Sequence, residues 1–120
     1  MLPDPFTIAA DSPNPSMVYA MVKTDGYGSE RHDATNGYVL VINHSTGKSG
    51  DRHYLKVSKS VDAVNPYSGL TQRQTASVSL SISTPPYGFA EADMAALYKA
   101  LVDIIADSEV TITKILEFQS

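Results

Sequence analysis

The order of apolar and polar positions along the chain predicts strands over its first two thirds. Short apolar or alternating runs at 6–10 and 17–23, separated by a loop with two prolines, are typical of a strand hairpin. A short strand is expected near 28–32, between Asp-Gly and Asn-Gly turns. The β-branched run at 38–44 predicts another strand, which a glycine-containing connection joins to a partner at 52–61.

The segment Ser77–Ser83, SVSLSIS, has the most regular pattern in the chain. Successive side chains leave a strand on opposite faces, so its aliphatic residues form one face and its serines the other. We expect this strand to begin near Arg73, after a loop at 62–72. Its aliphatic face, formed by Val78, Leu80 and Ile82, is expected to lie under the C-terminal helices.

Beyond residue 86 the apolar period becomes helical. Apolar residues at helical spacing predict a helix at about 90–106, with Glu91 and Asp93 in its first turn. A second, shorter helix is expected at about 108–116, with Ser108 as its N-cap.

Strands followed by helices indicate an α+β fold with a meandering antiparallel sheet. A chain of 120 residues fits one domain. Two short helices are a poor cover for a five-stranded sheet, because part of its aliphatic face stays exposed to water. The pattern therefore predicts that a second copy of the chain supplies the missing cover, as a homodimer.

Charge is unevenly distributed along the chain. The net charge is −4, but residues 48–73 carry +3 and the remainder carries −7. One face of the molecule is therefore expected to be basic. The N-terminus lacks the pattern of a signal peptide and no apolar run reaches membrane-spanning length, so no membrane partner is expected.

Residues for enzymatic chemistry are not arranged in a recognisable pattern. The chain has no cysteine, and His32, His44 and His53 lack the spacing of metal ligands. The run TGKS at 46–49 has Ile42 where a phosphate-binding loop needs its first glycine. We predict no enzymatic activity, no cofactor and no metal. Alternation places His44 on the aliphatic face of its strand, which predicts partial burial.

A polar surface is predicted at the strand RHYLKVSKS, residues 52–60. Alternation places two cations, one aromatic ring and hydroxyl groups on a single face, together with hydroxyls of the neighbouring strand. Cations neutralise phosphates, tyrosine stacks on unpaired bases, and short hydroxyls let an RNA backbone approach closely. The surface therefore suits RNA, and the competing interpretation is the solvated face of a one-sided sheet.

The order and spacing of these segments resemble the coat proteins of single-stranded RNA bacteriophages over almost the whole chain. The matching segments are YVLVINH, a glycine turn, RHYLKVSKS, a loop with Pro66, RQTASVSLSISTP and the helix EADMAALYKALVDII, with DGYGSERHD in the N-terminal half. The resemblance implies an N-terminal β-hairpin, a five-stranded antiparallel sheet and two C-terminal helices that interlock across a dimer with a ten-stranded sheet. The hairpin, main sheet and helices of the single domain would occupy 1–24, 25–83 and 84–120.

The resemblance also implies a function and a set of residues. Such dimers assemble in the bacterial cytoplasm into the icosahedral capsid of a virion, enclose the single-stranded RNA genome, and in well-known members repress translation through an RNA hairpin. The implied RNA-binding residues are Asn43, Arg52, Tyr54, Lys56, Ser58, Thr75, Ser77, Ser79 and Ser81. A loop at 63–71 would adopt different conformers between dimers, and the residues implied for it are Asn65, Pro66, Tyr67 and Gly69.

Three departures from the family pattern affect hairpin recognition. Val39 and Val41 stand where better-known members have threonine and serine that read an adenine, and Thr75 stands where they have a stacking tyrosine. Lys56 takes the place of the family's strand lysine. General packaging is compatible with these departures. The alternative function is a small dimeric module that binds a ligand or protein on the same face and forms no particles.

Overall fold

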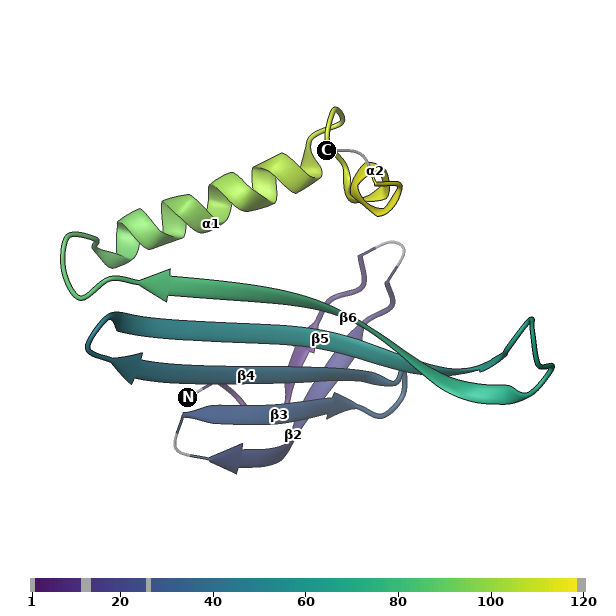
Figure 1. Cartoon of the computed structure of the whole chain (residues 1–120). Coiled ribbons are helices and arrows are strands. Elements are labelled where there is room, and N and C mark those ends of the chain that lie inside the picture. The colour runs from purple at the N-terminus through teal and green to yellow at the C-terminus, as the bar shows by residue number, and fades with distance from the viewer. Residues whose placement is uncertain (1, 12–13, 26, 119–120) are drawn as a thin grey trace. The chain divides into compact units, whose positions relative to one another are not determined.

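The computed structural model describes residues 2–11, 14–25 and 27–118 of the chain. Its elements are six strands followed by two helices (Figure 1). The chain divides into two compact units, Met1–Ser83 with the strands and Thr84–Ser120 with the helices. The α+β class and the order of strands before helices are as the sequence predicts.

All six strands of the first unit form one sheet in chain order. The strands are β1 (Phe6–Ile8), β2 (Met17–Asp25), β3 (Gly28–Asp33), β4 (Tyr38–Gly47), β5 (Gly50–Val64) and β6 (Thr71–Thr84). β2 pairs with β1 at its beginning and with β3 over its remainder, across an irregularity between Met21 and Lys23. The predicted hairpin and main sheet therefore share β2, and the sheet has six strands rather than the predicted five.

The connections on both sides of β5 are shorter than predicted. The pair Gly47–Gly50 continues the ladder of β4 and β5, which leaves Lys48 and Ser49 as a two-residue turn. Gly50 has a φ of 117°, which a residue with a Cβ adopts only under strain. The next loop occupies only 65–70, instead of the predicted 62–72, because both flanking strands continue farther.

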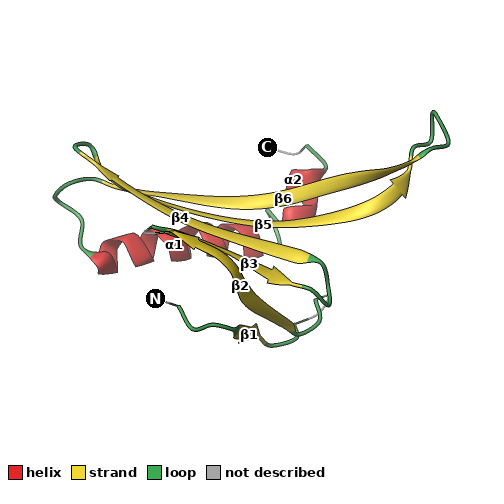
Figure 2. Ribbon diagram, turned by 90° about the horizontal axis from the view of Figure 1, so that it is seen from below, coloured by secondary structure: helices red, strands yellow, loops and turns green. Residues whose placement is uncertain are grey.

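Strands β5 and β6 extend beyond the rest of the sheet. β4 begins at Tyr38, opposite Lys59, so residues 60–64 continue past β4. Figures 1 and 2 show this part of β5 running beside β6 as a two-stranded ribbon that ends in the loop at 65–70. The ribbon thus presents both of its faces without support from β4.

The core of the sheet lies on one face of β2 and β4. Met17, Tyr19, Leu40 and Ile42 are buried there, and Phe6 of β1 lies with its ring centroid 5.4 Å from that of Tyr19. Alternation along β2 and β4 brings these residues to the same face. Burial raises the pKa of the Tyr19 phenol, and the charge of Asp33 and the Tyr38 phenol raise it further. We call this face the core face.

Arg31 is buried on the core face, which the sequence analysis did not predict. Its side chain is 1% exposed and lies with its guanidinium 4.9 Å from the centroid of the Phe6 ring. Its Nη1 donates to the Pro3 carbonyl at 2.6 Å and its Nη2 to the Leu2 carbonyl at 3.2 Å. Arg31 therefore holds the segment before β1 against the core face through these two hydrogen bonds.

Asp33 is the second buried charged residue of the core face. Its carboxylate accepts hydrogen bonds from the Asn36 side chain at 2.9 Å and from the backbone amides of Thr35 and Asn36 at 3.0 and 3.2 Å. The Asn36 side chain contributes most to holding the pKa of Asp33 below its usual value, against the opposing effect of burial. Asp33 thus fixes the turn between β3 and β4 as an ionised hydrogen-bond acceptor.

The second unit contains α1 (Glu91–Ala106) and α2 (Ile112–Leu116). The Asp93 carboxylate accepts from the Ala90 amide at 3.1 Å at the start of α1, close to the predicted boundary. The predicted cap and start of the second helix are wrong. The N-cap is Thr111, whose hydroxyl accepts a hydrogen bond from the Lys114 amide at 3.3 Å. Ser108 instead lies in a turn before the helix, in which the Asp107 carbonyl accepts hydrogen bonds from the amides of Val110 and Thr111.

No helix among the described residues has the length and apolar character needed to cross a membrane.

Candidate nucleic-acid interface

The face of the sheet opposite the core face gathers most of the residues predicted to contact RNA. Residues directly opposite each other in an antiparallel pair share a face. Asn43 pairs with Tyr54, and Val41 pairs with Lys56. The remaining pair, Val39 with Ser58, completes a row of three across β4 and β5.

β6 adds the hydroxyl residues to the same face. The Ser60 and Thr75 hydroxyls lie 2.7 Å apart, and Ser60 shares the face of Lys56 and Ser58 by alternation. Counting along β6 from Thr75 adds Ser77, Ser79 and Ser81, all of them exposed. We define the polar face as the side of the sheet formed by Val39, Val41, Asn43, Arg52, Tyr54, Lys56, Ser58, Thr75, Ser77, Ser79 and Ser81.

An open depression of about 380 Å³ lies at one end of the polar face. It is lined by Asn43, His44, Ser45, Arg52, Tyr54 and Ser81. The lining combines a guanidinium, a phenol ring, an amide and hydroxyls, which are the groups that bind phosphate, stack on a base and hydrogen-bond its edge. Tyr54 and Ser81 meet here, which agrees with the register counted from the Ser60–Thr75 contact.

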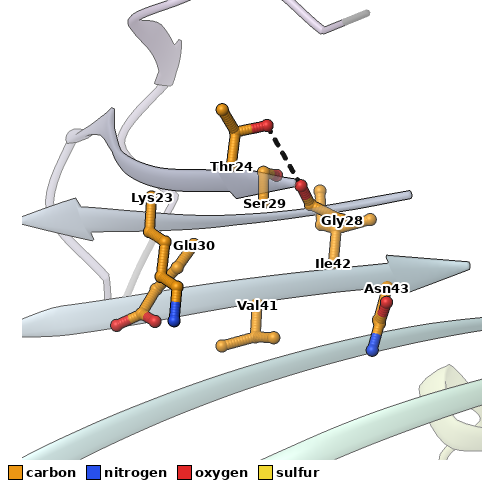
Figure 3. Close-up of a pocket in the computed structure, with 8 residues that line it drawn as sticks. All are labelled: Lys23, Thr24, Gly28, Ser29, Glu30, Val41, Ile42 and Asn43. Atoms are coloured by element: carbon orange, nitrogen blue, oxygen red, sulfur yellow. Dashed lines mark hydrogen bonds between the residues drawn. The ribbon is translucent and has the colours of Figure 1, made fainter. Parts of the chain in front are cut away.

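A second depression extends toward β2 and β3, and the sequence analysis missed it. It encloses about 140 Å³, and Figure 3 shows the side chains of Lys23 and Glu30 beside Val41 and Asn43. This volume is below the roughly 300 Å³ of a small-molecule pocket. Lys23 and Glu30 are opposite each other in the register. Only the irregularity in β2 brings Lys23 into this position, and a single sequence gives no signal for it.

The basic segment at 48–73 divides between the two faces. Arg52 and Lys56 belong to the polar face, and alternation from Thr75 adds Arg73. Lys59 instead pairs with Tyr38, and its ammonium lies 5.0 Å from the centroid of the Tyr38 ring. The polar face therefore carries only some of the five cations of the segment 48–73, and the predicted basic face is less basic than the charge of that segment suggests.

The three histidines lie in two different environments. His32 is on the polar side, where its Nε2 is 2.8 Å from a carboxylate oxygen of Glu30. His44 pairs with His53 on the core side, with 2.8 Å between their Nδ1 atoms. The predicted partial burial of His44 is wrong, because it lies beyond the buried part of β4 and is exposed. Among the described residues, no three histidine or acidic side chains cluster as metal ligands.

The loop residues predicted to lie between dimers form a tight, exposed turn. The Asn65 amide donates to the Leu70 carbonyl at 2.8 Å, and the Asn65 side chain accepts from the Tyr67 amide at 2.8 Å. Gly69 has a φ of 72°, while Tyr67 is 98% exposed and Pro66 is also exposed. These residues are available for contacts outside the chain, and their role between dimers stays a prediction.

Comparison of this fold with solved structures finds phage coat proteins. The virus-like particle of bacteriophage AVE019 has a TM-score of 0.76 at 15% identity, covering 90% of this chain and 90% of that chain. The coat protein of bacteriophage EMS014 has a TM-score of 0.65 at 16% identity, covering 93% and 82%. The capsid protein of bacteriophage GA has a TM-score of 0.55 at 13% identity, covering 98% and 95%. No family model and no curated protein matches the sequence.

The fold is thus that seen in phage coat proteins. The resemblance seen in the sequence and the similarity of the fold agree on this class. At these identities the comparison concerns the fold, and the RNA-binding role of each residue stays a prediction.

Proposed function

We propose that this chain is the coat protein of a single-stranded RNA bacteriophage. Its homodimers would assemble into the capsid of the virion and package RNA against the polar face. The observation that carries the proposal is the fold, which matches phage coat proteins over 90% or more of this chain in three comparisons.

The composition of the polar face supports RNA as its ligand. Arg52 and Lys56 provide cations on β5, and four exposed residues with small hydroxyls lie on the neighbouring β6. Small side chains let a phosphate backbone come close to the strand, and hydroxyls donate to phosphate or to a 2′-hydroxyl. This arrangement suits packaging of many RNA sequences.

Recognition of one hairpin has less support. Val39 and Val41 offer only aliphatic groups at the centre of the polar face, opposite Ser58 and Lys56. An aliphatic side chain cannot hydrogen-bond a base edge, so it cannot distinguish one base from another in that way. We therefore include general packaging in the proposal, and translational repression would need a different set of contacts.

Exposed apolar side chains support the dimer. On β5 and β6, Val61, Val64 and Val78 are 50%, 63% and 74% exposed within one chain. By alternation Val61 and Val78 lie on the core face and Val64 on the polar face. Exposed apolar surface is typical of an interface with another subunit. A second copy that pairs at the β6 edge would join the two sheets into one, as the resemblance implies, although each sheet here has six strands rather than five.

Size-exclusion chromatography of the protein made in bacteria tests the proposal. We expect a particle-sized peak whose ultraviolet absorbance is dominated by nucleic acid, since the chain has seven tyrosines and no tryptophan. A dimer-sized peak free of nucleic acid would instead support the alternative, a binding module that does not assemble.

The variant Ser77→Glu with Ser79→Glu tests the role of the polar face separately. Two carboxylates there would repel phosphates, so we expect folded dimers and particles with less RNA. Thr113→Glu, which adds one carboxylate in α2 of the other unit, is the control, and it is compared with Ser77→Glu and Ser79→Glu made singly as well as together. Unchanged RNA content in the double variant would exclude the polar face as the packaging surface.

A further inference from the structure

His44 and His53 face each other across β4 and β5 on the core side of the sheet. They are register partners, with 2.8 Å between the two Nδ1 atoms and 5.1 Å between the ring centroids. The rings are inclined by 72°, so neither ring covers the nitrogen of the other by stacking. His44 is exposed and His53 is partly exposed, so the paired nitrogens are accessible from solvent.

We propose that His44 and His53 together bind one divalent transition-metal ion, Cu²⁺ or Ni²⁺. Imidazole nitrogen is a preferred ligand of these ions, whereas Ca²⁺ and Mg²⁺ take oxygen ligands. Water completes the coordination of the ion. By register the two side chains belong to the core side of the sheet, although His44 also lines the depression at the end of the polar face, and the inference does not depend on RNA packaging.

The two nitrogens are close enough for one metal ion to bridge them. Two nitrogens at about 2.0–2.1 Å from a metal are about 2.9 Å apart when they subtend a right angle, and about 3.3 Å apart in a tetrahedron. The observed 2.8 Å is a hydrogen bond between the two imidazoles, so one Nδ1 carries a proton that the ion would replace, and both separations lie within a few tenths of an ångström of it. Binding needs both rings to turn their Nδ1 lone pairs toward one point, and the proton held between the two nitrogens moves to an Nε2 atom or to solvent.

The surrounding backbone holds the pair in place. The His44 amide donates to the Tyr27 carbonyl at 2.8 Å, which joins this part of β4 to its neighbour. Farther along the same face, the Thr46 hydroxyl donates to the Asp51 carboxylate at 2.6 Å across the two strands. A pair of ligands that is already fixed loses little conformational entropy on binding an ion. The Asp51 carboxylate also places negative charge on the same face as the ion.

His32 provides an internal control. It lies on the polar side of β3, and its Nε2 is 2.8 Å from Glu30 rather than from a second imidazole. His32 can therefore offer an ion only one imidazole nitrogen beside a carboxylate, and its substitution leaves the His44–His53 pair intact. The chain has three histidines, so three single substitutions test every imidazole in the protein.

Equilibrium dialysis of the untagged, nuclease-treated protein against NiCl₂, with bound metal counted by mass spectrometry, tests the site. We expect His44→Gln and His53→Gln each to lose one nickel ion per chain relative to the unsubstituted protein. His32→Gln should retain that ion. Equal metal content in all four proteins, or an equal loss in His32→Gln, would overturn the proposal.

Electron paramagnetic resonance of the Cu²⁺-loaded protein supplies a second readout that does not require a variant to fold. Coupling to two imidazole nitrogens is expected in the unsubstituted protein, and to one in either His44→Gln or His53→Gln. A spectrum of the unsubstituted protein without two coordinated imidazole nitrogens would contradict the site. Circular dichroism of each variant shows whether it keeps the fold.

Discussion

Apolar side chains on the core face are buried in one half of the sheet, β2 to β4, and more exposed in the other half, β5 and β6. In β2, β3 and β4, the residues Met17, Tyr19, Leu40 and Ile42 are buried within one chain. In β5 and β6, the apolar residues Val57, Val61 and Val78 are 37%, 50% and 74% exposed. On the core face, these residues of the first half are buried and these residues of the second half are exposed, a difference that agrees with the proposed dimer.

The difference has a structural cause in the N-terminal segment. Phe6 of β1 packs against Tyr19, and Arg31 binds the carbonyls of Leu2 and Pro3, so this segment lies over the core of the first half. β6 is the edge strand and its ribbon with β5 extends past β4. An edge with exposed apolar residues is a surface on which a second sheet can pair. The proposed dimer would therefore use the half of the sheet that does not contain the buried core.

The largest expected effect is the loss of stability on truncating the first half. Leu40→Ala removes a buried side chain and should lower the free energy of unfolding by about 2–5 kcal/mol, measured by urea denaturation at fixed protein concentration. Its register partner Val57 is 37% exposed, so Val57→Ala is the matched control and should cost less. Equal losses in the two variants would contradict the difference between the halves.

A charge in the second half should affect association more than folding. Val78→Asp places a carboxylate on the proposed subunit interface and should raise the dimer dissociation constant at least about tenfold, equivalent to roughly 1.4 kcal/mol. Sedimentation over a range of concentrations measures it. Ser79→Asp adds the same charge on the opposite face, and dimerisation should be little changed. If both variants dimerise as well as the unsubstituted protein, β6 is not the interface.

The buried carboxylate of the first half gives a smaller effect that depends on pH. Hydrogen bonds from Asn36 hold the pKa of Asp33 below its usual value of 3.8, so the ionised form stabilises the fold above that value. This contribution is lost as pH falls through the lower pKa of the folded state. Asp33→Asn should flatten the acidic part of a curve of thermal midpoint against pH.

The exposed Asp62 serves as the control for Asp33. Asp62→Asn should leave the acidic part of the same curve with the slope of the unsubstituted protein. If the two variants change the slope equally, the Asp33 turn is not the source of the acid sensitivity.

The smallest effect concerns the two lysines of β5, which lie on opposite faces. Lys56→Gln removes a cation from the polar face and should reduce the salt dependence of RNA binding by about 0.7 in log–log slope, the value for one phosphate contact on a single strand. Lys59→Gln removes the cation beside Tyr38 and should leave that slope unchanged. Filter binding at several salt concentrations measures both. An equal reduction would show that the faces do not differ in their contact with RNA.

Several features of the fold and the candidate site could be predicted from the sequence. The alternation in SVSLSIS and RHYLKVSKS places their side chains on two faces, because successive residues of a strand point in opposite directions. The register of β4 and β5 then brings Tyr54 and Lys56 beside Asn43 and Val41 as the pattern indicated. The predicted long helix also formed, since its apolar spacing and acidic first turn are local properties.

Other features could not be predicted because they depend on residues far apart in the chain. The burial of Arg31 requires the carbonyls of Leu2 and Pro3, which lie 28 and 29 positions away. The polar residues Lys23 and Glu30 meet only because of the irregularity between Met21 and Lys23. Such an irregularity changes which face a residue occupies, and no local pattern marks it.

By itself, the sequence determined the order of strands and helices, the α+β class and the composition of each strand face, since these follow from the short repeats of backbone geometry. Only the tertiary structure decided that β2 is shared by the hairpin and the rest of the sheet, that Arg31 and Asp33 are buried, and that His44 meets His53. The physical reason is that register and turn length select cross-strand neighbours, and these are fixed by contacts between distant segments.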